Sequence, residues 1–261
     1  MSAVHEESTA ELLVQESGGV LTLLINRPAQ RNAMTLAVAE QIAAAMDELD
    51  RRPDLAVAVL GGTGGVFCAG MDLKRFLLGE RPRVPGRGFG GLVEQPPAKP
   101  LIAAVEGWAL AGGFELVLAC DLVVAGESAR FGLPEVKRGL PAAAGGLLRL
   151  PRRLPHNVAM ELILTGEPID APSLAAHGLV NRVVDDGTAV DSALALATTI
   201  AANAPLALMA AKDIANRSAD WPLADMFAIQ RPLVDRVFAS ADAQEGARAF
   251  AEKRPPVWSG R

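Results

Sequence analysis

The sequence predicts an α/β fold in which short buried strands alternate with glycine turns and helices. Three observations support this prediction. Strand, glycine turn and helix follow one another three times between residues 55 and 154. Half of the 261 residues are hydrophobic and 21% are charged, which suits a chain with a sizeable buried core. From about residue 156 the pattern becomes mostly helical, and residues 200–261 contain no obvious strand.

The N-terminal part of the chain predicts a hairpin, a helix and a buried strand. Residues 11–25 have the pattern of two short strands around a Ser-Gly-Gly turn. After a proline-containing loop at 26–34, apolar residues recur at helical spacing from Thr35 to Asp50. Thr35 is a suitable N-cap, because its side-chain oxygen can accept a hydrogen bond from the first turn. A short buried strand is then expected over 55–60.

The middle of the chain predicts the repeated units. The segment 61–70, GGTGGVFCAG, is a glycine-dense connection, and a helical turn or two is expected over 71–78. Residues 79–100 are the longest irregular stretch, rich in Gly, Pro and Arg, and such loops tend to be mobile or functional. The expected elements that follow are a strand at 101–107, a glycine turn at 111–113, a helix at 114–120, a strand at 121–125, the segment 129–135, and a glycine turn with a helix within 139–154.

Composition limits the classes of partner and site. The formal net charge is −5, and no long basic run with interleaved aromatic residues occurs, so nucleic acid is not an expected partner. The acidic N-terminal segment lacks the pattern of a signal peptide, and the apolar runs at 55–60 and 101–105 are too short to span a membrane. Cys68 and Cys120 form neither metal-ligand spacing nor a disulfide framework. We therefore expect no metal site, no membrane partner and a reduced, cytoplasmic setting.

Two glycine turns, after Leu60 and after Trp108, are candidate anion sites. A backbone N–H at the start of a helix can donate to a developing negative charge, and glycine allows close approach of a ligand. Two such turns could aim two amides at one oxygen and so form an oxyanion hole, in which each donor contributes roughly 3 kcal/mol of transition-state stabilisation. On spacing alone, ordinary tight turns are the better explanation of both segments, because Gly-Gly turns are common.

Two glutamates stand near glycine-rich turns. Glu115 lies two residues after Gly113 in the apolar segment FELVLAC, where burial would raise its pKa towards the range of a general base. Glu135 follows Pro134 in a turn before another glycine-rich segment. Taken singly, Glu115 is explained by a helix N-terminus or an arginine partner, and Glu135 by a solvated loop. Together, beside an oxyanion hole, they would suit proton transfer next to a carbonyl group.

Other catalytic patterns are absent from the sequence. His156 and His177 have no partner at metal-ligand spacing, so we interpret both as structural or solvated residues. Neither a GxSxG nucleophile motif, nor a GxGxxG fingerprint after a strand, nor a Walker A motif occurs.

Six segments occur in order from about residue 12 to the C-terminus: NRPAQRNAM, VFCAGMDLK, AVEGWALAGGFELVLACDLVVA, ARFGLPEVKRG, AAHGLVNRVV and FAEKRPPVW. On these segments the chain resembles the crotonase superfamily, the enoyl-CoA hydratase/isomerase group. The resemblance implies a crotonase-like spiral of ββα units with an acyl-CoA site over residues 1–198. It also implies a C-terminal helical trimerisation region over 199–261, and a homotrimer or a dimer of trimers.

The resemblance also implies the site residues. Met71 and Gly112 match the positions whose amides form the oxyanion hole, and Glu115 and Glu135 match the two acids of the family's hydratases. The positions implied to bind CoA are Cys68, Ala69, Gly70, Asp72 and Leu73, together with Phe250 and Lys253, which match positions that reach the CoA of a neighbouring subunit. A lysine there would suit the CoA phosphates as a point charge.

The implied activity is hydration of trans-2-enoyl-CoA to 3-hydroxyacyl-CoA. Glu115 would activate water and Glu135 would protonate Cα, with no cofactor required because coenzyme A is part of the substrate. A double-bond isomerase and a non-catalytic acyl-CoA-binding protein remain as alternatives. Two departures bear on the site: Met71 stands where many hydratases have a small residue, and GLPAAAGG has Pro141 one place early and Ala143 in place of a glycine.

Overall fold

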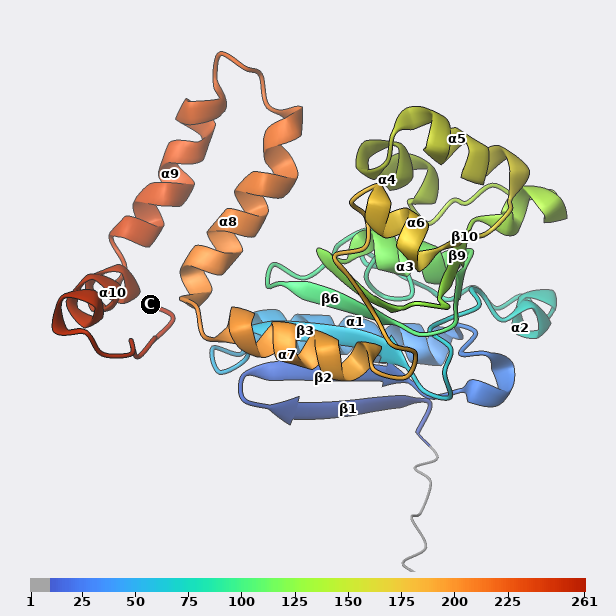
Figure 1. The fold of residues 1–261 in the computed structure, drawn as a ribbon, viewed down its shortest axis with the longest axis horizontal. Helices are drawn as coiled ribbons and strands as arrows, with labels where there is room; N and C mark the ends of the chain where they lie inside the picture. The colour runs from blue at the N-terminus through green and yellow to red at the C-terminus, as the bar shows by residue number, and fades with distance from the viewer. Residues whose placement is uncertain (1–9) are drawn as a thin grey trace, which may run out of the picture.

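The computed structural model describes residues 10–261, and it consists of an α/β core with a helical arm at its C-terminal end (Figure 1). Residues 1–9, where the sequence predicts no signal peptide, lie outside the described part of the chain. The main sheet has six strands in the order β1 (Leu12–Ser17), β2 (Val20–Ile25), β3 (Val57–Gly62), β6 (Leu101–Val105), β8 (Leu122–Gly126) and β11 (Arg182–Val184). The β1–β2 pair is antiparallel and the other neighbours are parallel, so the predicted α/β class is confirmed.

Smaller strand groups and helices complete the core. A three-stranded sheet contains β10 (Ile169–Asp170), β9 (Arg130–Gly132) and β7 (Trp108–Leu110), and β4 (Arg83–Val84) pairs with β5 (Gly88–Phe89). The core helices are α1 (Leu36–Arg51), α2 (Leu73–Leu77), α3 (Gly112–Ala119), α4 (Gly146–Arg153), α5 (His156–Thr165), α6 (Ala171–Ala176) and α7 (Ala189–Ala201). Short 3-10 turns form η1 (Pro28–Gln30) and η2 (Pro134–Arg138). The predicted N-cap of α1 is confirmed, because the Thr35 side chain accepts a hydrogen bond from the Val38 amide.

The inner strands of the main sheet, β2, β3, β6 and β8, are buried on both faces, and their side chains alternate between the two. In β3, Ala58 and Leu60 join the larger core cluster, which also contains α1 and α3, while Val57 and Val59 face the other way. That second face is covered by α7, whose Ala189, Ala193 and Ala197 are all buried against it. Small residues every four positions form one stripe of a helix, so α7 lies close to the sheet.

The C-terminal arm has little core of its own. Helices α8 (Pro205–Arg217) and α9 (Met226–Phe238) contain no buried residue, and in Figure 1 they stand away from the sheet as an antiparallel pair. η3 (Ser218–Asp220) follows α8, and α10 (Ala241–Glu252) lies at the far end of the arm. An ion pair of 2.6 Å between Lys212 Nζ and Asp121 Oδ2 connects α8 to the core. The division of the chain into a core with an acyl-CoA site (residues 1–198) and a helical oligomerisation region (residues 199–261) stays a prediction.

The strand prediction missed several short elements. β7 begins at Trp108, directly after the predicted strand, and β11 lies in the region predicted to be mostly helical. The irregular stretch at 79–100 contains the small β4–β5 hairpin. Among residues 10–261, no single helix is long and apolar enough to cross a membrane, although α7 and the segment Pro205–Asp220 meet those criteria as a pair bent by 109°.

Candidate active site

A cavity of about 250 Å³ brings together four segments that are distant in the sequence. They are the loop before α2, the residue Phe89 of β5, the turn from β7 into α3, and the segment from η2 to α4. Its lining residues are Ala69, Met71, Leu73, Phe89, Leu110, Ala111, Gly112, Glu115, Pro134, Glu135, Arg138, Leu140, Pro141, Ala143 and Ala144. Met71, Gly112, Glu115 and Glu135, the four residues predicted to perform the chemistry, therefore face one space.

The turn from β7 into α3 is strained. Ala111 has φ 52° and ψ −127°, a left-handed conformation that a residue with a Cβ rarely adopts and that costs roughly 1–3 kcal/mol. Its amide donates to the Gly132 carbonyl at 2.9 Å, which connects this turn to β9. Gly112 then becomes the first residue of α3, so its N–H has no acceptor within the helix. The strain thus directs a free amide into the cavity.

Glycine is required where this turn packs. A Cβ on Gly112 would overlap the ring of Phe89, and a Cβ on Gly113 would overlap the carbonyl oxygen of Cys68. The Cys68 carbonyl accepts a hydrogen bond of 3.0 Å from the Leu110 amide, and the Cys68 amide donates to the Trp108 carbonyl at 3.0 Å. The loop that carries Met71 therefore lies directly alongside the turn that carries Gly112.

Met71 is held from its other side by the loop before α1. The Met34 amide donates to the Gly70 carbonyl at 2.8 Å, and the Asp72 amide donates to the Met34 carbonyl at 3.0 Å. These bonds flank the Met71 amide and leave it out of the pairing. Within residues 10–261, neither the Met71 amide nor the Gly112 amide donates to a protein acceptor. Two main-chain donors are thus available to a ligand in the cavity.

A buried ion pair fixes the same loop. Arg27 donates to Asp72 Oδ2 at 3.1 Å and to Glu11 Oε1 at 2.9 Å, and Asp72 caps α2 by accepting from two amides of its first turn. Burial alone would raise the pKa of Asp72, but these amides and the Arg27 charge together hold it below its ordinary value. The Asp72 side chain is therefore committed to fixing the loop directly after Met71.

Glu115 is nearly fully buried, with 3% of its surface exposed, in the first turn of α3. Its Oε1 accepts a hydrogen bond of 2.9 Å from the Gly146 amide at the start of α4. A Cβ at position 146 would lie 3.0 Å from that oxygen, so glycine permits this approach. Burial raises the pKa of Glu115 to about 7, and the Glu135 charge adds to the increase against the opposing effects of the Gly146 amide and Arg149.

Glu135 lies in η2, and burial raises its pKa above the ordinary value. Its Oε2 is buried, and within residues 10–261 that oxygen has no hydrogen-bond partner. A buried, unpartnered carboxyl oxygen favours the protonated form. The Glu115–Glu135 pair therefore combines one oxygen that already accepts an amide with one that is free to carry a proton.

The predicted CoA-binding positions separate into three groups. Ala69 and Leu73 line the cavity, and Leu73 is half exposed at its mouth. Cys68 is fully buried with its pKa raised to about 12 by burial, Gly70 packs under Ala111, and the Asp72 carboxylate is turned towards Arg27, so the predicted contact of these three residues with CoA stays a prediction. Phe250 and Lys253 are exposed on α10, away from this cavity, and their predicted contact with a neighbouring subunit stays a prediction.

Four residues of the site were not found from the sequence. Phe89 and Leu110 contribute apolar walls, Arg138 lies beside Glu135, and Arg149 acts electrostatically on Glu115. Phe89 lies in a stretch without periodic pattern, so no local signal indicates its position. For Arg149 a signal existed, because a cation three residues after Gly146 lies one helical turn from the N-terminus of α4.

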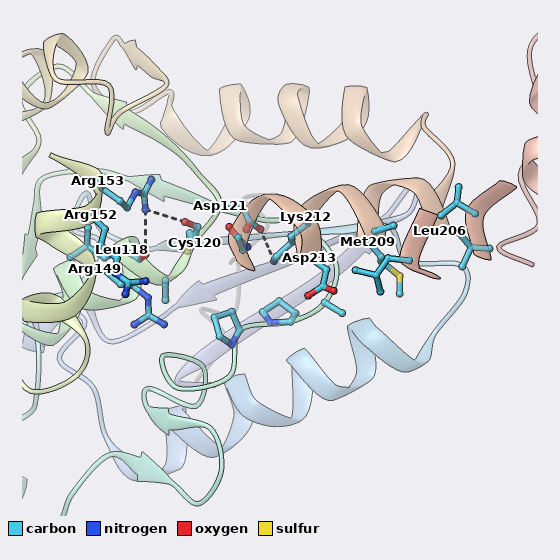
Figure 2. A pocket seen from close by; sticks show the side chains of 18 of the residues that line it. Leu118, Cys120, Asp121, Arg149, Arg152, Arg153, Leu206, Met209, Lys212 and Asp213 are labelled. Carbon is cyan, nitrogen blue, oxygen red and sulfur yellow. Dashed lines mark hydrogen bonds and ion pairs between the residues drawn. The ribbon is translucent and has the colours of Figure 1, made fainter. Parts of the chain in front are cut away.

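A second, larger cleft of about 810 Å³ lies between the core and the arm. Figure 2 shows Arg149, Arg152 and Arg153 on its core side and Met209, Lys212 and Asp213 on α8. Neither Glu115 nor Glu135 lines it, so these two carboxyl groups belong to the smaller cavity alone. Among residues 10–261, no group of three or more His, Cys, Asp or Glu residues is placed to hold a metal ion.

Comparison with known proteins gives consistent matches over nearly the whole chain. The family described as enoyl-CoA hydratase/isomerase matches residues 15–261. The enoyl-CoA hydratase EchA19 of Mycobacterium tuberculosis is 41% identical over 98% of each chain, and a carnitinyl-CoA dehydratase of Proteus mirabilis is 40% identical over 94% of this chain and 96% of its own length. The crystal structure of enoyl-CoA hydratase EchA1 from Mycobacterium marinum superimposes with a TM-score of 0.94 at 54% identity, covering 96% of this chain and 99% of that one.

Proposed function

The chain belongs to the enoyl-CoA hydratase/isomerase family, and from that premise we propose that it hydrates trans-2-enoyl-CoA thioesters to 3-hydroxyacyl-CoA. One observation carries the proposal: two carboxyl groups with raised pKa, Glu115 buried and Glu135 half-buried, and two free main-chain amides line the same cavity. Hydration of a conjugated thioester needs a stabilised oxyanion, a base and an acid, and this set of groups supplies all three.

The amides of Met71 and Gly112 hold the thioester oxygen in the proposed complex. When water adds to Cβ, negative charge moves to that oxygen and forms an enolate. Amides already directed into a buried site stabilise this charge without reorganisation, at roughly 3 kcal/mol for each donor. Gly112 is the first residue of α3, so the helix dipole adds to the effect.

The two glutamates divide the proton transfers. Glu115 accepts a proton from water as the water oxygen bonds to Cβ, and Glu135 donates a proton to Cα. The sum is one water added across the double bond, with one proton moved from Glu135 to Glu115, and exchange with solvent restores the starting state. The hydrogen bond from Gly146 favours ionised Glu115, while the unpartnered Oε2 favours protonated Glu135. Because the carboxyl groups are coupled, they titrate as a pair.

The alternative of a double-bond isomerase requires one acid to move a proton between two carbons. Two acids in one cavity favour hydration, because adding water requires a base and an acid on the reacting carbons at once. The same pair argues against a protein that only binds acyl-CoA, since carboxyl groups whose pKa is raised by burial are typical of sites that transfer protons. The proposed chemistry uses proton transfers and an oxyanion only, so coenzyme A enters as part of the substrate.

The test follows the conjugated enoyl-thioester absorbance with crotonyl-CoA and a panel of longer and branched enoyl-CoA esters. We expect the absorbance to fall and a 3-hydroxyacyl-CoA product to form. Glu115→Gln and Glu135→Gln should each lower kcat by about 10²- to 10⁴-fold, while acyl-CoA binding is retained. A new absorbance from 3-enoyl substrates without hydration would indicate the isomerase. Binding without turnover of any ester would indicate the non-catalytic protein.

We also propose that the chain assembles as a homotrimer or a dimer of trimers through the arm. The support is the lack of buried residues in α8 and α9 and the exposure of Phe227 and Phe238. Lys253 and Phe250 at the far end of the arm would reach the CoA of a neighbouring subunit. Light scattering coupled to gel filtration should give a trimer or hexamer mass. Lys253→Ala should weaken CoA-ester binding at low salt, with a difference that shrinks as salt rises.

A further inference from the structure

Arg149 connects three parts of the candidate site. It lies in α4, one turn after Gly146, and its side chain folds back towards the start of the helix, where a Cβ on Gly145 would overlap its guanidinium. Its Nη2 donates to the Val93 carbonyl at 2.6 Å. Val93 is buried in the 79–100 segment, which also carries Phe89. One side chain thus joins this segment to the turn that supplies the Gly146 amide.

The connected parts both contact the catalytic groups of the proposed function. The Gly146 amide bonds Glu115, and the Phe89 ring packs on Gly112. Figure 2 shows Arg149 beside Arg152 and Arg153 at the edge of the larger cleft, on the side of the core. Among the described residues, Arg149 has no carboxylate within ion-pair distance, so its charge acts on Glu115 without closing a salt bridge on it. A direct ion pair would hold the carboxylate as an anion and weaken it as a base.

We propose that Arg149 is a positioning residue for Glu115: it clamps the 79–100 segment onto the first turn of α4 and keeps the Gly146 amide and a positive charge beside the carboxylate. This inference rests on the proposed function, because it concerns the same site. It assigns the residue to the set that holds Glu115, and not to contact with the substrate.

The charged groups around Glu115 determine how its pKa would respond to a substitution of Arg149. Glu115 faces Glu135 from η2, whose charge raises the Glu115 pKa, and Arg149 from α4, whose charge lowers it. Arg149 in turn faces Glu115 and Cys120 of α3, and its own pKa is lowered chiefly by burial. Arg153, one turn further along α4, also interacts with Cys120 and Arg149. Removing the Arg149 cation is therefore expected to increase the pKa of Glu115.

The experiment compares Arg149→Met and Arg149→Lys with Arg152→Met. Arg152 is the matched control, because it lies on the same helix but pairs with Asp220 at 3.2 Å and does not act on Glu115. In Arg149→Met, a cation removed near a carboxyl should raise its pKa by about one unit, which lowers kcat roughly fivefold at pH 7 and leaves it nearly unchanged at pH 9. Arg149→Lys should recover most of the pH profile, and Arg152→Met should match the parent.

A second readout is independent of turnover. In protein labelled with ¹³C at the glutamate carboxyl carbons, the Glu115 signal is identified by its loss in Glu115→Gln, and its titration is followed in each variant. An upward shift of the Glu115 pKa in Arg149→Met, but not in Arg149→Lys or Arg152→Met, supports the inference. This holds even if the parent hydrates none of the esters tested, an outcome that would contradict only the proposed function. An unchanged Glu115 titration, or a loss of kcat equal at pH 7 and pH 9, would overturn the positioning role.

Discussion

The turn from β7 into α3 and the α8–α9 pair are opposite cases of how a segment is held in place. Every residue from Gly112 to Ala119 is buried, and the turn is fixed by backbone bonds to two other segments. In α8 and α9 no residue is buried, and the contacts with the core are polar: Lys212 pairs with Asp121 and donates to the Lys99 carbonyl. The proposed chemistry lies where the single chain determines the geometry, and the proposed assembly surface lies where it does not.

Burial has different consequences in the two regions. Around Glu115 it removes water from a charged group and raises its proton affinity, at a cost in stability. In the arm, the exposed rings of Phe227 and Phe238 leave apolar surface in water, which favours association. The comparison predicts that substitutions in the turn change folding and chemistry, while substitutions in the arm change assembly. The predictions below test this division, beginning with the largest expected effect on stability.

Gly113→Ala should be the most damaging single change. The added Cβ would overlap the Cys68 carbonyl oxygen and break its bond with the Leu110 amide, lowering the free energy of unfolding by about 4 kcal/mol. Gly18→Ala is the control for crowding, because no atom lies within 4 Å of a Cβ there, and the positive φ of 56° at Gly18 should cost only about 1 kcal/mol. Urea unfolding measures both. Equal losses would mean that the turn is not tightly packed.

Arg27→Met should cost about 3 kcal/mol at pH 7, because it leaves the buried Asp72 charge without its partner. The pKa of Asp72 is lowered in the folded protein, so its stabilising contribution is present above the unfolded pKa and is lost as pH falls through the folded value. The difference from the parent should therefore shrink as the pH falls below the range in which an ordinary aspartate titrates. The arm offers a contrast in Arg217→Met, which breaks an exposed pair with Asp213 and should cost under about 0.5 kcal/mol.

Glu115→Gln should stabilise the protein at high pH while abolishing the proposed base. The folded-state pKa is raised to about 7, so the parent loses stability as pH rises through that value, and the variant does not. At pH 8 we expect the variant to be more stable by about 2 kcal/mol, and near pH 4 the two should be equal. Thermal unfolding at both pH values checks this. A constant difference would show that Glu115 titrates normally.

Phe227→Ser should have the smallest effect on the core, below about 0.5 kcal/mol, because this ring is 73% exposed in the single chain. Its effect should instead appear as a lower assembly mass in light scattering. Hydrogen exchange of the β3 and β6 amides tests the separation directly. If their protection falls together with the assembly, then the arm and the core unfold as one unit and the contrast between the regions is lost.

The fold could be predicted from the sequence where the pattern is local and long enough. Residues 36–51 repeat apolar positions over several turns, and α1 was found with its Thr35 cap. β7 spans only Trp108–Leu110 between a glycine and a strained alanine, too short for alternation to be visible. β11 is a short edge strand with exposed residues, so its pairing with β8 depends on contacts far along the chain.

The candidate site divides in the same way. Glu115, Glu135, Met71 and Gly112 were named from their motifs, and they do line one cavity, although their catalytic roles stay predictions. The side-chain partner of Asp72 could not be predicted, because the sequence does not show that Arg27, 45 positions earlier, binds its carboxylate. Arg149 and Phe89 depend in the same way on tertiary contacts that no local pattern specifies.

The positive φ of Ala111 has a consequence for how the substrate is bound. Because the chain adopts this conformation when it folds, the direction of the Gly112 amide is set before any thioester arrives. Binding of the thioester therefore does not have to order this donor. The conformational entropy of fixing the Gly112 amide is lost when the protein folds. An enzyme built in this manner should need no rearrangement of this turn when the thioester binds.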